Sequence, residues 1–142
     1  MKSAVIESPL PMGKYPDIID LHYAGHLTIR IDPGIGKGQI EVFFDKPHGF
    51  RCLDEGDLSY WDDKTLVDNW FFEITDGGWL RLEHGGQLGI SSTTPQMREF
   101  LICSSNDCVT VLSPSPPILR VIPNSEQDAG LQDLTRRESK AP

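Results

Sequence analysis

The sequence predicts a β-rich α+β fold: a single domain built on an antiparallel sheet of about six strands, arranged as three hairpins, with one or two short helices. Three stretches alternate apolar and polar residues on both sides of a turn signal, which is the pattern of strands with one buried face. Sustained helical periodicity is scarce. The length of 142 residues is that of about one domain, and no internal repeat or second core is evident.

The first hairpin is predicted over residues 27–44, where apolar residues alternate on either side of a turn at 33–38. That turn contains Gly34-Ile35-Gly36-Lys37-Gly38, whose closely spaced glycines invite comparison with a phosphate-binding loop. A phosphate loop places Ser or Thr after the lysine and then opens a helix, whereas here a glycine and a strand follow. The segment is therefore better interpreted as a hairpin turn.

The other strands follow from the same pattern. The second hairpin is predicted over residues 70–82, with Asp76-Gly77-Gly78 as its turn. The third is predicted over residues 99–112, with a turn at 104–107. Residues 118–122 are apolar and are isolated by prolines, which confine a strand to the edge of a sheet.

Two short helices are predicted between these hairpins. One lies within residues 58–69, where Asp57 is suited to cap the first turn. The other starts at Thr94, with Pro95 in the first helical position and residues 97–100 following. Both are one to three turns long, so they add little to a fold that strands dominate.

The two ends of the chain differ in composition from the middle. Residues 1–16 contain three prolines, and residues 123–142 contain four apolar groups and no aromatic side chain. Such segments bury too little surface to offset the entropy of ordering them. The sequence therefore predicts a flexible N-terminal segment over 1–16, a β-rich globular domain over 17–122, and a flexible polar tail over 123–142.

Negative charge is concentrated in one window, residues 52–80. It holds eight carboxylates and one lysine, a net charge of −7 within a total of −8. Like charges held close together repel, so the window lowers stability unless a partner neutralises it. Nucleic acid is excluded as a direct ligand, because its phosphates require clustered Lys and Arg that the chain lacks. A basic protein is the partner that this charge favours.

The same window holds all three tryptophans, and it divides into two parts. Trp70, Phe72 and Trp79 fall in the second predicted hairpin and are expected to be mainly core residues. The plain alternative for the acids is that they serve only as turn and helix-capping residues. An aromatic side chain exposed within an acidic surface can anchor a protein complex. The predicted partner-binding residues are Asp54, Glu55, Asp57, Tyr60, Trp61, Asp62 and Asp63.

No catalytic or metal-binding motif stands out elsewhere, so no catalytic residue, metal or cofactor is assigned. His22, His26 and His48, with nearby carboxylates, are the alternative on which a small enzyme or a metal-binding protein would depend. His22 and His26 lack an evident third ligand. His48 and Cys52 would lie about 13 Å apart on an extended chain, beyond hydrogen-bond reach.

The chain has three cysteines, and this odd, low count does not indicate a disulfide framework. Cys103 and Cys108 flank the turn of the third hairpin, so they are expected to face each other, as reduced thiols packed in a sheet. Cys52 is expected to be a small core residue. The chain has no apolar run near the roughly 20 residues of a membrane helix and no secretion signal at its start. A soluble, cytoplasmic protein is therefore expected.

The stretch Gly49-Phe-Arg-Cys-Leu-Asp-Glu-Gly-Asp-Leu-Ser-Tyr-Trp61, with the later Trp70 and Gly78-Trp79, resembles the Trp, Gly and Asp style of bacterial immunity proteins. Bacteria keep these proteins against their own polymorphic or contact-dependent toxins. The resemblance covers about a quarter of the chain. It implies a non-enzymatic inhibitor that binds a toxin domain, often a basic nuclease, in a fixed ratio. A structural subunit or assembly adaptor that pairs its sheet edge with another copy is the remaining alternative.

Overall fold

The computed structural model describes residues 2–13, 16–54, 69–80 and 97–124. Within these ranges the chain forms two antiparallel sheets, one of five strands in the order β1-β6-β7-β8-β5 and one of four strands in the order β2-β3-β4-β9. The strands are β1 (Lys2–Val5), β2 (Asp17–Tyr23), β3 (Leu27–Asp32), β4 (Gln39–Phe44), β5 (Gly49–Asp54), β6 (Phe71–Asp76), β7 (Arg98–Cys103), β8 (Asp107–Ser113) and β9 (Ile118–Ile122).

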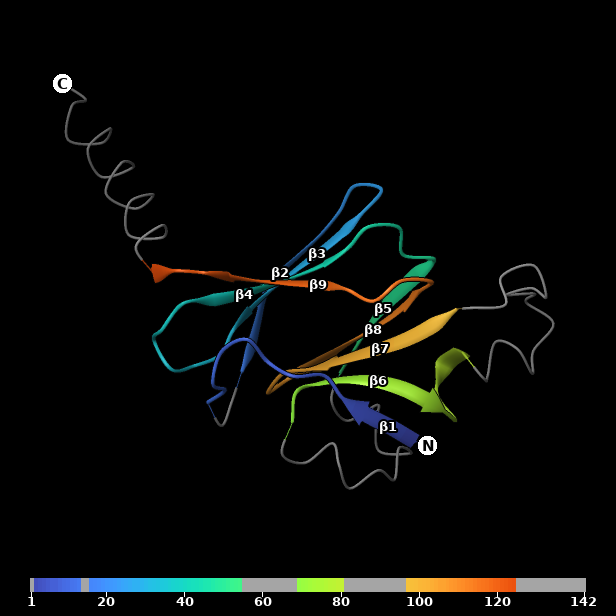
Figure 1. The fold of residues 1–142 in the computed structure, drawn as a ribbon, viewed down its shortest axis with the longest axis horizontal. Coiled ribbons are helices and arrows are strands. Elements are labelled where there is room, and N and C mark those ends of the chain that lie inside the picture. The colour runs from blue at the N-terminus through green and yellow to red at the C-terminus, as the bar shows by residue number, and fades with distance from the viewer. Residues whose placement is uncertain (1, 14–15, 55–68, 81–96, 125–142) are drawn as a thin grey trace.

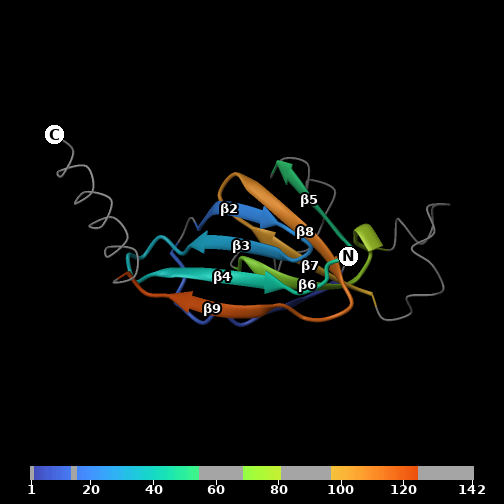
Figure 2. The ribbon, with the colours of Figure 1, turned by 90° about the horizontal axis from the view of Figure 1, so that it is seen from above.

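The two sheets form two layers with the main core between them (Figure 1). Figure 2 shows that the strands of the two layers cross rather than run parallel. Strands β3 and β4 alternate buried and half-buried residues along their whole length, so each gives one face to the core. The buried residues of this core are Leu27, Ile29, Ile31, Ile40, Val42, Phe44, Trp70, Phe71, Phe100, Ile102, Val109 and Val111.

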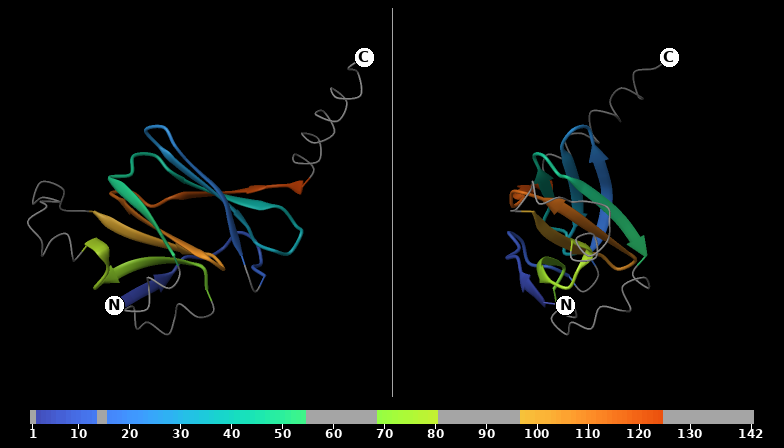
Figure 3. Two further views of the ribbon diagram at one scale, coloured as in Figure 1. Left: turned by 180° about the vertical axis from the view of Figure 1, so that it is seen from behind. Right: turned by 90° about the vertical axis from the view of Figure 1, so that its right-hand side faces the viewer.

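The five-stranded sheet is buried on both faces at its centre. Strand β7 has four consecutive buried residues, and all of β8 after Asp107 is buried. On the face turned away from the other sheet, Phe72, Leu101 and Cys108 belong to a second apolar cluster. Strands β1 and β5 form the two edges of this sheet (Figure 3). Continuous apolar runs in β7 and β8 are what burial on both faces requires.

Several sequence predictions are confirmed. The first predicted hairpin is β3 and β4, whose turn contains glycines with positive φ at positions 34, 36 and 38. The third is β7 and β8, in which Cys103 lies opposite Cys108. The predicted edge strand is β9, which ends the four-stranded sheet beside β4. For the two hairpins local alternation and a turn signal were sufficient, and for β9 the flanking prolines were.

The prediction of one sheet of about six strands is wrong in number and arrangement, although the β-rich class is confirmed. Nine strands form two sheets in the described ranges. The predicted second hairpin is not formed, because β6 pairs with β1 and β7 and the residues after it turn away as a short helical segment. Sheet pairing between distant segments is decided by burial, which local alternation does not reveal.

The two predicted helices have different outcomes in the structure. Residues 98–100, expected to be helical, are the start of strand β7, because the burial of both faces of that strand outweighs a local helix signal. The helix expected within 58–69 falls almost entirely outside the described residues. Strands β1, β2 and β5 were not predicted, and β1 lies in the segment expected to be flexible. None of the described helical residues forms an apolar segment long enough to span a membrane.

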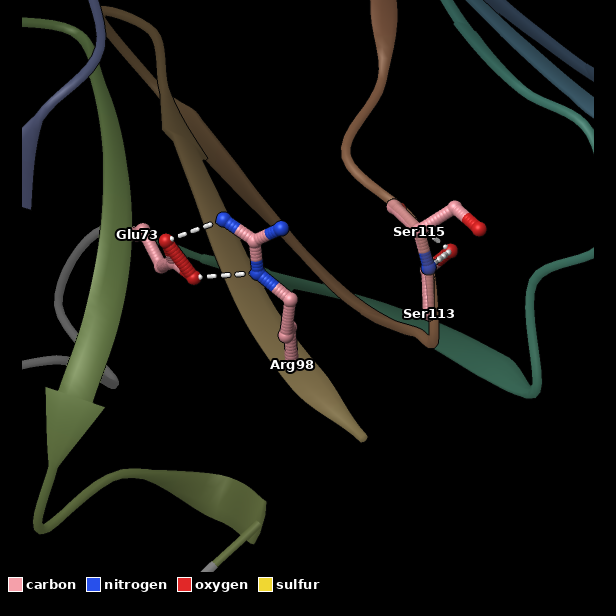
Figure 4. Close-up of polar contacts among 4 residues, drawn as sticks. All are labelled: Glu73, Arg98, Ser113 and Ser115. Carbon is pink, nitrogen blue, oxygen red and sulfur yellow. Dashed lines mark hydrogen bonds and ion pairs between the residues drawn. The ribbon is translucent and has the colours of Figure 1, made fainter. Parts of the chain in front are cut away.

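A charged pair joins the neighbouring strands β6 and β7 where β7 begins. Arg98 on β7 donates two hydrogen bonds of 2.7 Å to the Glu73 carboxylate on β6 (Figure 4). Its guanidinium also lies over the ring of Phe100, 5.4 Å from the centroid. Nearby, the Ser113 hydroxyl donates to the Ser115 carbonyl oxygen at 2.8 Å, where the chain leaves β8 for the other sheet. A two-bond Arg–carboxylate pair fixes orientation as well as contributing energy.

Glu99 is a buried carboxylate that explains why the chain turns away after β6. Its side chain is 1% exposed, on the outer face of the five-stranded sheet. The carboxylate accepts hydrogen bonds from the backbone N–H groups of Trp79 at 3.1 Å and Leu80 at 2.7 Å. Arg51 lies over the Trp79 ring, 4.7 Å from its centroid. The carboxylate thus takes N–H groups that a return strand would have used in a ladder.

This arrangement leaves no room for a side chain at position 78. A Cβ on Gly78 would collide with Glu99 Oε2 and would meet Ile74 Cγ2 at 2.7 Å. Gly78→Ala is therefore expected to lower the free energy of unfolding by about 1–3 kcal/mol. Gly49→Ala is the matched control, because its Cβ would meet only Trp79 at an ordinary 3.8 Å. Urea denaturation of both variants measures the difference, and equal effects would contradict the close contact with Glu99.

Burial raises the pKa of the Glu99 carboxyl, and the N–H groups of Leu80 and Trp79 and the charge of Arg51 oppose this rise. The native state therefore binds the Glu99 proton more tightly than the unfolded chain. The resulting stability is fully present below the ordinary pKa of 4.5 and is lost as pH rises through the native pKa. Relative to Glu99→Gln, the wild type should gain stability as pH is lowered toward about 4.5. Urea denaturation across that range tests this, and a constant difference would contradict it.

Candidate functional site

The candidate site is a group of carboxylates at one end of the sandwich, which we call the acidic end: Asp17, Asp32, Asp54 and Asp107. Its first pair comes from the five-stranded sheet, where Asp54 ends β5 and lies opposite Asp107, the first residue of β8. Both are exposed. Like charges directly opposite on neighbouring antiparallel strands are destabilising. The fold therefore places two acids at opposing positions of neighbouring strands.

The turn between β7 and β8 is built by Ser104. Its backbone N–H donates to the Asp107 carbonyl oxygen at 2.8 Å and closes the hairpin, and its hydroxyl donates to the same oxygen at 2.9 Å. The Ser104 hydroxyl oxygen also accepts the Asp107 N–H at 3.0 Å. A serine at the start of a turn satisfies backbone groups in this way. These bonds fix the position of Asp107 at the tip of the hairpin.

The tip of this hairpin joins the two sheets. Ser105 donates its backbone N–H to the Pro16 carbonyl oxygen at 3.0 Å and its hydroxyl to Asp17 Oδ1 at 2.8 Å. Asp17 starts β2 and lies opposite Asp32, which ends β3. Asp32 in turn accepts the Gly34 N–H at 2.8 Å. Acids from both sheets are thereby brought to one end of the molecule.

Described residues on both sides of positions 55–68 lie at this same end. Asp54 precedes that segment and is the strand partner of Asp107. After it, the Trp70 carbonyl oxygen accepts the N–H of Cys103 at 2.7 Å, next to the same hairpin turn. Asp57, Asp62, Asp63 and Asp68 lie between Asp54 and Trp70 in the sequence.

Three of the four acids at the acidic end have no oppositely charged partner within the described part of the chain. Asp17, Asp32 and Asp107 form no ion pair with any residue there. The pKa of the Cys52 thiol is raised by partial burial and also by the negative charge of Asp107. Carboxylates that form no ion pair within the protein suit the binding of Lys and Arg side chains.

The structure places one of the predicted partner-binding residues, Asp54, at the acidic end. The others, Glu55, Asp57, Tyr60, Trp61, Asp62 and Asp63, lie outside the described residues. Trp70 and Phe72 are core residues as predicted. Trp79 is half-buried and covers Arg51 on the outer face of the five-stranded sheet.

The three histidines of the alternative interpretation do not come together. His22 lies on β2, and His26 lies in the next turn with its ring 5.3 Å from that of Phe43. His48 precedes β5, and its N–H donates to the Leu112 carbonyl oxygen at 2.7 Å. Among the described residues, no three His, Cys, Asp or Glu side chains are grouped so that they could hold a metal ion.

Cys52 differs from its prediction. It was expected in the core, but it is exposed, because β5 is an edge strand that the other sheet covers only in part. The chain from Gly49 to Asp54 is extended, as the spacing argument for His48 and Cys52 assumed. These two residues are therefore not a nucleophile and its base.

Sequence reasoning missed three members of the acidic end, Asp17, Asp32 and Asp107, because they lie outside the window with the highest charge. For Asp107 a signal was present, because it is the last residue of the predicted hairpin turn at 104–107. Asp32 is also placed by the sequence, at the end of the first predicted strand, whereas for Asp17 the signal is missing, since β2 shows no clear alternation. Their approach to Asp107 depends on the contact between the two sheets.

Comparison with protein-family models, with curated proteins and with solved structures gives no match to this chain. The geometry of the acidic end and the charge of the sequence are therefore the basis on which a function is proposed below.

Neutralising one acid of the facing pair should stabilise the fold. Asp107→Asn keeps the size of the side chain and removes its charge opposite Asp54. We expect the free energy of unfolding to rise by about 0.2–1 kcal/mol at low salt, with a smaller gain at high salt. Asp45→Asn, an exposed acid in the turn after β4, is the matched control and should have little effect. A loss of stability in Asp107→Asn, but not in Asp45→Asn, would show that repulsion between the two facing acids does not lower stability.

Proposed function

We propose that this chain is a non-enzymatic, acidic binding protein that neutralises a basic protein partner, and that it acts as an immunity protein against a bacterial toxin. The observation that carries the proposal is the gathering of Asp17, Asp32, Asp54 and Asp107 from two sheets at one end of the molecule. Asp54 and Trp70, which are also at this end, lie on either side of the four further aspartates at 57, 62, 63 and 68 in the sequence.

The energetic arrangement supports a binding role. Facing acids such as Asp54 and Asp107 lower stability, and such conflicts persist where a function maintains them. A basic partner would relieve the repulsion, so part of the binding energy would come from removing it. A concentrated negative field also speeds the encounter with a basic surface, toward about 10⁸–10⁹ M⁻¹s⁻¹ at low salt.

Rigidity supports the same role. The Asp17 carboxylate is held by the Ser105 hydroxyl, and the Ser104 hydrogen bonds fix the backbone of Asp107, so both acids are carried on an ordered part of the chain. Preorganised charged groups bind more tightly because less conformational entropy is lost on association. The resemblance of residues 49–61 to immunity proteins gives the class of partner, a toxin domain with a basic surface. The site of action would then be the cytoplasm of the toxin-producing cell.

The proposal is tested with the protein encoded directly upstream of this gene, the position expected for a toxin. Growth rescue on co-expression measures neutralisation, and calorimetry at about 50 and 200 mM salt measures affinity. We expect binding that weakens with salt. Asp54→Lys combined with Asp107→Lys should weaken binding by about 2–5 kcal/mol and abolish rescue, because two attractive charges are replaced by charges that repel a basic partner.

The control is Asp45→Lys, a single charge reversal in the turn after β4. This turn is at the opposite end of the four-stranded sheet from Asp32, so binding and rescue should be unchanged. Unfolding of each variant is measured alongside, so that loss of binding is separated from loss of fold. Unchanged affinity in the Asp54/Asp107 variant would refute the acidic end as the contact surface. Absence of any binding to the upstream product would count against the immunity role.

A further inference from the structure

Cys103 and Cys108 occupy opposing positions of the third hairpin, and backbone hydrogen bonds show which kind of opposing pair they form. The Cys103 N–H donates to the Trp70 carbonyl oxygen on the β6 side, at 2.7 Å. The next residue pair, Ser104 and Asp107, carries the bond that closes the hairpin. Since hydrogen-bonded and non-hydrogen-bonded pairs alternate along antiparallel strands, Cys103 and Cys108 form a non-hydrogen-bonded pair.

This type of pair has the geometry that a disulfide needs. Opposing residues in it have Cα atoms about 4.5 Å apart and side chains that approach most closely. A disulfide is accommodated when the Cα atoms are about 4.4–6.8 Å apart. Opposing residues also point to the same face, and both cysteines belong to the apolar cluster on the outer face of the five-stranded sheet. The two sulfur atoms can therefore be joined without displacing either strand.

The third cysteine is kept away from this pair. Cys52 lies opposite Val109, the neighbour of Cys108 in β8, so its side chain points to the other face of the sheet. Cys103 is half-buried, whereas Cys108 is 1% exposed. The accessible member of the pair is therefore Cys103, and the buried member lies next to it.

We propose that Cys103 and Cys108 are a reversible oxidation site, which forms an intramolecular disulfide by exchange with a small disulfide such as oxidised glutathione. The Cys103 thiolate attacks one sulfur of the oxidant and releases one glutathione thiolate. The Cys108 thiolate then attacks Cys103 Sγ in this mixed disulfide and releases the second. The two protein thiols lose two electrons and two protons, and the oxidant becomes two glutathione thiols.

The cross-link would join β7 and β8 one residue pair from the turn that carries Ser105 and Asp107. It would therefore fix covalently the hairpin tip that contacts Pro16 and Asp17 in the other sheet. This inference rests on strand register and does not depend on the proposed function. A protein that binds no toxin would still carry the oxidation site.

The test uses the full chain with Cys52→Ser, equilibrated with mixtures of oxidised and reduced glutathione, quenched with acid and analysed by intact mass. We expect a species lighter by about 2 Da, the two hydrogen atoms lost, with peptide mapping that joins residues 103 and 108. Wild-type protein should give the same cross-link. A cross-link that involves Cys52, or glutathione adducts alone, would overturn the proposal.

The same equilibrium measured in concentrated guanidinium separates the effect of the fold from mere proximity along the chain. Because the native strands already align the thiols, the equilibrium constant for the disulfide should be at least about tenfold larger in the native protein. An equal or smaller native constant would show that the register does not favour the bond. Cys108→Ser in the Cys52→Ser background is the matched control and should stop at the mixed disulfide on Cys103.

Discussion

The structure depends on covering both faces of the central strands β7 and β8. One face packs against β3 and β4 across the main core, where Phe100, Ile102, Val109 and Val111 are all buried. The other face buries Leu101, Cys108 and Leu112, with Trp79 over its β5 side. Apolar burial on two sides stabilises these strands far more than a one-sided sheet of the same size, because the hydrophobic contribution grows with the apolar area removed from water.

This double burial explains the polar features of the fold. Glu99 is buried near the start of an otherwise apolar strand, so its carboxylate must be satisfied inside the protein, and two backbone N–H groups of residues 79 and 80 do this. The same bonds redirect the chain after β6. Where β7 begins, Arg98 and Glu73 supply a paired charge at the point where the core meets solvent. Polar groups thus mark the places where the apolar layers end.

The acidic end follows a different rule from the rest of the molecule. Elsewhere on the four-stranded sheet, charges on neighbouring strands alternate in sign, with Arg30 beside Asp20 and Arg120 beside Glu41. At the acidic end, by contrast, Asp54 faces Asp107 and Asp17 faces Asp32. A fold selected only for stability would not collect like charges on opposing positions. This contrast within one protein supports the proposed binding role of that end.

The sequence by itself determined the β-rich class, two of the three hairpins, the edge strand β9 and the opposition of Cys103 and Cys108. The hairpins and the cysteine pair depend on contacts between neighbours in the chain, which alternation and turn residues encode, whereas β9 was indicated by apolar residues isolated between prolines. It also located the excess negative charge. The tertiary structure alone decided that there are two sheets, that β6 pairs with β1, and that Asp17 approaches Asp107. Those contacts join segments far apart in sequence, and they form because the central strands must be covered on both faces.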